Sequence, residues 1–121
     1  MAKILIIEDN STMGEGMLEI LQKEGHLVDL AYQGEQGVIL IKRHQYDLIF
    51  CDMRLPDMSG LEVLAEHQSS KSKAKFVFIT AFGNIELAVE CIKKGAYDFI
   101  PKPFTPNVLR EKVIEYTQKK E

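Results

Sequence analysis

The chain has few cysteines, and their placement excludes two common kinds of small protein. Its 121 residues include only Cys51 and Cys91, far apart and without a CxxC pair, which argues against a disulfide scaffold and against a zinc site. Both lie in apolar surroundings, so we predict buried thiols that suit a reducing cytosol. The three histidines, His26, His44 and His67, show no metal-ligand spacing, and we expect surface or hydrogen-bonded side chains.

Long hydrophobic runs and an excess of basic residues are also missing. The apolar stretch around Phe76–Ile79 is far too short to span a bilayer. Ile4–Ile7 is followed at once by Glu8 and Asp9, unlike the apolar region of a signal peptide. The chain carries 15 Lys and Arg against 18 Asp and Glu, a net charge of −3, with no basic stripe. We therefore expect a cytoplasmic domain that does not itself bind nucleic acid or membranes.

Five short apolar runs alternate with amphipathic segments. Such continuous runs are typical of strands buried on both faces of a parallel sheet. Alternation of strands and helices predicts one α/β domain over residues 1–121, with a doubly wound five-stranded parallel sheet and helices on both faces. This is a flavodoxin-like three-layer sandwich, and we take the strand order 2-1-3-4-5 from that fold class because the sequence alone does not reveal it. The predicted strands are residues 4–7, 27–31, 48–51, 76–79 and 97–100.

The segments between the strands have helical periodicity. After Asn84, a suitable N-cap, apolar residues recur at i, i+3, i+4 and i+7 until Gly95 ends the pattern. An earlier helix is predicted to end at Gly25, and the next to begin near Gly34. Further predicted helices contain Leu61 and Leu64, and Leu109, Val113 and Tyr116.

Three glycines interrupt these helices. Gly14, Gly16 and Gly37 fall inside predicted helices, where each should cost about 1 kcal/mol relative to alanine. Loosened helices and close approach of a neighbouring element both remain open as explanations.

Acidic residues follow two of the predicted strands. Glu8 and Asp9 come after the first strand, and Asp52 comes after the third, in YDLIFCDMRLPDMSG. With the order 2-1-3-4-5 these strands are neighbours, so the three carboxylates converge where ligands bind in open α/β sheets. Converging carboxylates repel one another, and Mg²⁺, which prefers oxygen ligands, would relieve that repulsion. Taken singly, Glu8 and Asp9 could simply favour the N-terminus of the helix near Ser11, but three acids at adjacent strand ends weaken that explanation.

A hydroxyl and an ammonium group stand at the ends of the remaining strands. Thr80 closes FVFIT and Lys102 follows YDFIP. Together they would provide a donor and a positive charge for a phosphoryl group beside the metal. Pro103 follows Lys102, and such an X-Pro bond can be cis.

In this combination the motifs resemble the receiver domain of response regulators in two-component signalling, a CheY-like domain. The resemblance covers essentially all 121 residues. It is carried by Glu8-Asp9, by Asp52 with MRLPDMSG after it, by Thr80-Ala81 and by Lys102-Pro103-Phe104.

The resemblance implies a covalent switch in which Asp52 accepts a phosphoryl group from a phosphohistidine on a sensor histidine kinase. Asp9, Asp52 and the backbone carbonyl of Arg54 would ligate Mg²⁺, and Glu8 would act through a metal-bound water. The domain would thus be a regulatory switch that promotes its own phosphorylation and dephosphorylation, and not an enzyme.

The same resemblance implies roles for further residues. Lys102 would pair with the phosphoryl oxygens, Thr80 would hydrogen-bond one of them, and Phe99 stands at the switch-aromatic position. Arg54 and Phe82 lie two residues beyond Asp52 and Thr80, where the family influences the lifetime of the phosphoryl group; their bulk predicts slow self-dephosphorylation.

Two other functions compete with a receiver. A Mg²⁺-dependent phosphatase of the haloacid-dehalogenase type would also use a strand-end Asp, a Thr and a Lys. It requires a second Asp two residues after the first, where this chain has Arg54, and the chain leaves little length for a cap over the substrate. An interaction domain that kept the fold and lost the chemistry would not need Asp52, Thr80 and Lys102 together.

The partners follow from the resemblance as expectations. The stretch TAFGNIELAVECIKKGAYDFIPKPF is similar to receivers joined to AAA+ transcriptional activators. We therefore expect the domain to be the N-terminal part of a longer regulator, with an effector domain or target protein as its output. Homodimers are also common in the family.

Overall fold

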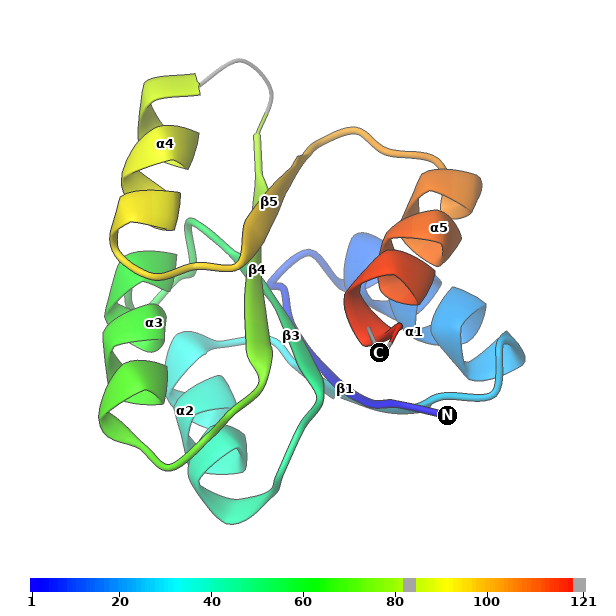
Figure 1. The fold of residues 1–121 in the computed structure, drawn as a ribbon, viewed down its shortest axis with the longest axis horizontal. Helices are drawn as coiled ribbons and strands as arrows, with labels where there is room; N and C mark the ends of the chain where they lie inside the picture. Colours follow the sequence, from blue (N-terminus) through cyan, green and yellow to red (C-terminus); the bar gives the residue numbers. More distant parts are fainter. Residues whose placement is uncertain (82–84, 119–121) are drawn as a thin grey trace.

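The computed structural model describes residues 1–81 and 85–118, without the side chain of Ile85. Its architecture is a five-stranded parallel sheet in the order β2-β1-β3-β4-β5, with a helix after each strand (Figure 1). The predicted strand order and fold class are confirmed. The elements are β1 (Lys3–Ile7), α1 (Ser11–Lys23), β2 (Leu27–Ala31), α2 (Gly34–Arg43), β3 (Leu48–Asp52), α3 (Gly60–Ser69), β4 (Lys75–Thr80), α4 (Ile85–Lys93), β5 (Asp98–Pro101) and α5 (Pro106–Thr117).

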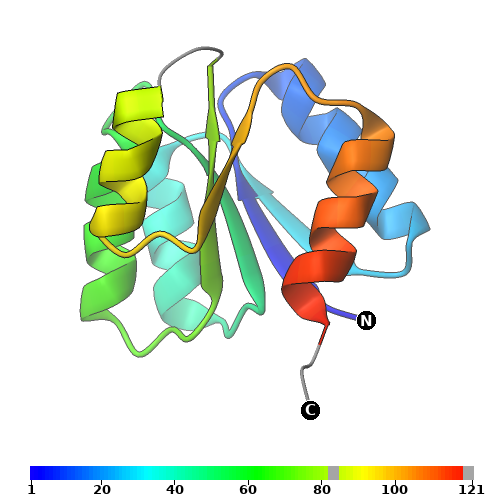
Figure 2. The ribbon, with the colours of Figure 1, turned by 45° about the horizontal axis from the view of Figure 1, so that its top comes forward.

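The helices form one layer on each side of the sheet. Figure 2 shows α2, α3 and α4 on one side, and α1 and α5 on the other. Alternate residues of the central strands feed two separate apolar cores, because successive side chains of a strand point to opposite faces. In β3, Ile49 and Cys51 belong to the core under α2, α3 and α4, whereas Leu48 and Phe50 belong to the core under α1 and α5.

Burial on both faces holds only for the three central strands. β1, β3 and β4 are buried almost throughout, as their apolar runs predict. The same prediction is wrong for β2 and β5: Leu27 is 55% exposed, and each of these strands has only one fully buried residue. Both are edge strands with a neighbour on one side only, so the sheet and helices cover them incompletely.

Side-chain caps and glycines define the helix ends. Asn10 Oδ1 accepts a hydrogen bond from Met13 N (3.0 Å) and so caps α1. Glu8 Oε2 also accepts a hydrogen bond at this end, from the backbone N of Asn10 (3.2 Å), so Glu8 contacts the start of α1 although Asn10 is its cap. Gly25 (φ 89°) and Gly95 (φ 112°) follow α1 and α4 in left-handed conformations, as the predicted helix stops require. Asn84, the predicted cap of α4, lies outside the described residues.

The interior glycines differ in their surroundings. A Cβ on Gly37 would lie 2.4 Å from Ile7 Cδ1, and one on Gly14 would lie 3.0 Å from Leu30 Cδ1. At these two positions a helix approaches the sheet closely. A Cβ on Gly16 would meet nothing within 4 Å, and nothing in the structure explains a glycine there.

The cysteines match their prediction, and one histidine does not. Cys51 and Cys91 are free and buried, and burial raises the pKa of both thiols. His67 is neither exposed nor fully hydrogen-bonded. It is buried, its ring lies 5.3 Å from that of Phe76, and its Nδ1 has no hydrogen-bond partner in the described part of the chain. Its pKa is lowered because burial disfavours the charged form.

No helix in the described ranges has the length and apolar character needed to cross a membrane.

Alanine substitutions separate the two kinds of helical glycine. We expect Gly16→Ala to raise the free energy of unfolding by about 0.5–1 kcal/mol, since alanine favours the helix and has room there. Gly37→Ala should lower it by roughly 1–3 kcal/mol, because the added methyl group overpacks against Ile7. Urea unfolding of both variants checks this, and stabilisation by Gly37→Ala would contradict the close packing.

The lowered pKa of His67 predicts a dependence of stability on pH. Below about pH 6.5 the unfolded chain protonates His67 more readily than the folded protein does. The contribution of His67 is therefore fully present above that pH and is lost as the pH falls. We expect the unfolding free energy of His67→Gln to fall less than that of wild type between pH 7 and 5.5. The exposed His44 provides the control, His44→Gln, which should follow wild type; equal behaviour of all three proteins would refute the prediction.

Candidate functional site

The strand register brings the acidic residues together. Ile7 of β1 pairs with Cys51 of β3, so the next residues, Glu8 and Asp52, leave the sheet side by side. Carboxylate oxygens from Glu8, Asp9 and Asp52 all lie within 4.8 Å of one another. The convergence expected from the strand ends is therefore present.

Asp52 is held by the backbone of the loop that follows β3. Arg54 N donates a hydrogen bond to Asp52 Oδ1 (3.0 Å), which places the Arg54 backbone beside this carboxylate. Gly60 N donates to Met53 O (2.8 Å) and closes the base of the loop. A Cβ on Gly60 would lie 2.5 Å from Asp52 O, so a larger residue would push this backbone away.

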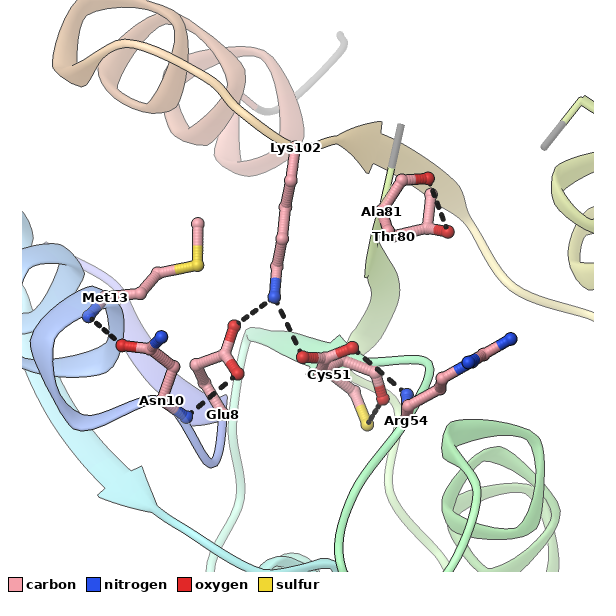
Figure 3. Close-up of polar contacts among 9 residues, drawn as sticks. Glu8, Asn10, Met13, Cys51, Arg54, Thr80, Ala81 and Lys102 are labelled. Carbon is pink, nitrogen blue, oxygen red and sulfur yellow. Dashed lines mark hydrogen bonds and ion pairs between the residues drawn. The ribbon is translucent and has the colours of Figure 1, made fainter. Parts of the chain in front are cut away.

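Lys102 joins the acids from the other end of the chain. Its Nζ lies 2.6 Å from Glu8 Oε1 and 2.8 Å from Asp52 Oδ2, and Figure 3 shows the Lys102 side chain pointing towards Glu8. Its backbone N donates to Thr80 O (2.6 Å). The Lys102–Pro103 peptide bond is cis.

Burial and crowding shift the ionisation of this group. Glu8 is fully buried, and burial, with a contribution from Asp52, raises its pKa to about 7 against the opposing effects of Lys102 and the Asn10 N–H. Burial acts to lower the pKa of Lys102, but its contacts with Asp52 and Glu8 outweigh it, and the net shift is upward. Lys102 is thus kept charged between the acids.

The donor set suits a divalent cation. When all three acids are ionised, they carry three negative charges against the single charge of Lys102. Carboxylate oxygens are the ligands that Mg²⁺ prefers, and Asp9 is exposed to solvent, so an ion can reach it. The acidic cluster Glu8, Asp9 and Asp52 is therefore able to bind a metal.

Thr80 and Phe99 lie at the same rim but on the opposite face of the sheet from Asp52. Phe78 pairs with Phe99, and alternation places the Thr80 side chain on the same face as both aromatic rings. The Thr80 hydroxyl donates to Ala81 O (3.4 Å), as Figure 3 shows. Phe99 is half-buried against the core under α2, α3 and α4. Phe82 lies outside the described residues.

One connection at the border of the site was not predicted from the sequence. Asp57, in the loop after β3, accepts hydrogen bonds from Gly34 N (2.8 Å) and Glu35 N (2.9 Å) at the start of α2. The only signal in the sequence was an acid in a turn, which many sequences contain.

Comparisons with known proteins agree with this geometry. Residues 4–114 match the family model described as the response regulator receiver domain. The transcriptional regulatory protein CusR of Escherichia coli K12 is 37% identical over 102 residues, which are 84% of this chain and 45% of CusR. This chain therefore matches less than half the length of that relative.

Solved structures give the same result. A CheY-like receiver domain protein from Methanospirillum hungatei JF-1 superimposes with a TM-score of 0.87 at 31% identity, covering 93% of this chain and 90% of the other. NtrX from Brucella abortus, solved in complex with ADP, superimposes with a TM-score of 0.88 at 32% identity, covering 95% of this chain and 26% of NtrX. The chain belongs to the response regulator receiver domain family of two-component signalling.

Proposed function

We propose that the domain is a phosphorylation-dependent switch whose phosphoacceptor is Asp52. The observation that carries the proposal is the position of this carboxylate. Asp52 is at the carboxyl end of the central strand, with one oxygen on Arg54 N and the other on Lys102 Nζ, and with Asp9 beside it. These contacts support a carboxylate that is oriented as a nucleophile.

The proposed transfer is a displacement at phosphorus. The P–N bond of a phosphohistidine on a sensor kinase breaks, and a bond forms between phosphorus and a carboxylate oxygen of Asp52. The electron pair of the broken bond leaves on the imidazole nitrogen. Lys102 would offset negative charge on the transferring oxygens, as phosphoryl transfer requires mainly positioning and charge stabilisation.

Mg²⁺ is the proposed cofactor. Asp9, Asp52 and the Arg54 carbonyl would hold it, with Glu8 acting through a metal-bound water; when bound, it supplies positive charge next to the phosphoryl oxygens. The surplus of carboxylates over the single ammonium of Lys102 supports this assignment.

Thr80 and Phe99 are the proposed switch residues. Phosphorylation would replace the single negative charge of Asp52 with a group carrying about −1.5 to −2 and attract the Thr80 hydroxyl away from Ala81 O. The vacated space would admit Phe99, which shares its face of the sheet. A shift from 1:99 to 99:1 requires roughly 5.5 kcal/mol, and a few charge-assisted hydrogen bonds of about 1.5–3 kcal/mol each are of that size.

The signalling role sets the proposed partners. A sensor histidine kinase would donate the phosphoryl group in the cytoplasm, and the domain would act as a switch and not as an enzyme. It would form the N-terminal part of a longer regulator, with an AAA+ activator as one candidate for the attached effector. NtrX, most of which lies outside the matched region and which was solved with ADP, supports an effector that binds a nucleotide. A homodimer is also proposed by analogy with the family.

Acetyl phosphate tests the phosphoacceptor directly. With Mg²⁺ present, wild type should gain the mass of one phosphoryl group in intact-mass analysis, and Asp52→Asn should gain none. Asp47→Asn is the control, because Asp47 bonds Lys3 N away from the acidic site. If Asp52→Asn still gained a phosphoryl group, Asp52 would not be the phosphoacceptor. Repeated turnover of a phosphomonoester by wild type would favour a phosphatase.

Mg²⁺ should stabilise the folded protein through the same acids. At a hundredfold excess over its dissociation constant the ion should add about 2.7 kcal/mol to the unfolding free energy. Asp9→Asn should lose most of that gain while Asp47→Asn keeps it. Thermal unfolding with and without Mg²⁺ measures the effect, and an equal gain in all three proteins would show that the ion binds elsewhere.

A further inference from the structure

The loop after β3 provides the missing cap of α2. The N-cap residue of α2, Gln33, makes no side-chain capping hydrogen bond. Instead Asp57, more than twenty residues away in sequence, accepts from Gly34 N with Oδ1 (2.8 Å) and from Glu35 N with Oδ2 (2.9 Å). These N–H groups belong to the first turn of the helix and have no partner within it. Both also lower the pKa of Asp57, so the carboxylate stays ionised and able to accept.

The same loop packs directly on the first turn of α2. A Cβ on Gly34 would lie 2.2 Å from Met58 Cγ and 2.6 Å from Met58 Sδ. A larger residue at position 34 would have to displace the Met58 side chain. The loop therefore touches α2 through two adjacent residues, one by hydrogen bonds and one by packing.

The base of this loop is part of the acidic site. Arg54 pairs with Ser59 in an isolated antiparallel bridge, and Gly60 N donates to Met53 O (2.8 Å). Arg54 N also donates to Asp52 Oδ1 (3.0 Å). The loop is thus closed at a base that includes the Arg54 backbone, and its tip is attached to α2.

We propose that Asp57 is a positioning residue for the phosphoacceptor site. By tying the loop tip to α2, it restricts the backbone at Arg54 to the conformation in which the N–H orients Asp52 and the carbonyl is available to the metal. This inference rests on the proposed function for the role of that carbonyl. Freeing the loop tip would add conformations that metal binding must then remove. Coupling of this kind is reciprocal, so a ligand held by the loop base would also stabilise the start of α2.

Removing the carboxylate tests the inference. In metal-free Asp57→Ala, amide hydrogen exchange should speed up at Arg54 and Gly60 as well as at Gly34 and Glu35. Mg²⁺ affinity, measured by calorimetry, should fall on the order of tenfold, the lower end of what is lost when the groups that orient metal ligands are removed. Asp57→Asn keeps one acceptor oxygen and should recover part of both losses.

The control must lower stability without touching the loop. Tyr46→Phe removes the hydrogen bond from the Tyr46 hydroxyl to Asp29 Oδ2 (2.6 Å), which joins the segment before β3 to the middle of β2. Its exchange rate at Arg54 and its Mg²⁺ affinity should stay within about twofold of wild type, which is well under 1 kcal/mol.

Two outcomes overturn the proposal. The first is faster exchange in Asp57→Ala confined to Gly34 and Glu35, with Arg54 no faster than in Tyr46→Phe; Asp57 would then only cap a helix. The second is an unchanged Mg²⁺ affinity in Asp57→Ala while wild type binds the ion. If wild type itself binds no Mg²⁺, the proposed function fails, and the exchange rates at Arg54 alone decide whether Asp57 positions the loop.

Discussion

The functional site depends on electrostatic repulsion between carboxylates at the carboxyl ends of β1 and β3. Parallel strands in register deliver Glu8 and Asp52 to the same point, and Asp9 follows immediately. Lys102 enters from the last strand and contacts two of the three acids, which offsets part of the repulsion. Burial raises the pKa of Glu8 to about 7. A site that is under-neutralised in this way favours any cation that can complete it.

The stability supplied by the two apolar cores offsets the unfavourable charge repulsion at the site. Separate apolar clusters on the two faces of the sheet supply the burial that stabilises the fold. Their shared sheet also links the two faces at the rim. Asp52 pairs with Ile79 across β3 and β4, so Thr80 is the next residue along, with its side chain on the opposite face. A change at Asp52 thus reaches the face that contains Phe99 through one residue of backbone.

Connections between loops and helices extend the site beyond its charged residues. The start of α2 lacks its own side-chain cap and depends on Asp57 from the loop after β3. The C-terminal end of α4 depends similarly on α3, because Gln68 Nε2 donates to Lys94 O (2.6 Å). When a side chain from a neighbouring segment hydrogen-bonds the backbone at a helix end, the same bond also restrains that neighbouring segment. The loop that includes Arg54 is therefore anchored from outside the site.

The sequence by itself determined the central strands, the alternation with helices and the residues at the strand ends, since hydrophobic periodicity and strand termini are local properties. From these, the convergence of Glu8, Asp9 and Asp52 followed once a strand order was assumed. Only the tertiary structure decided which strands lie at the edges, that His67 is buried, that Gly37 is required by Ile7, and that Asp57 bonds to α2. Each of these depends on which segments meet in space, and packing and hydrogen bonds between residues distant along the chain leave no periodic signal in either partner alone.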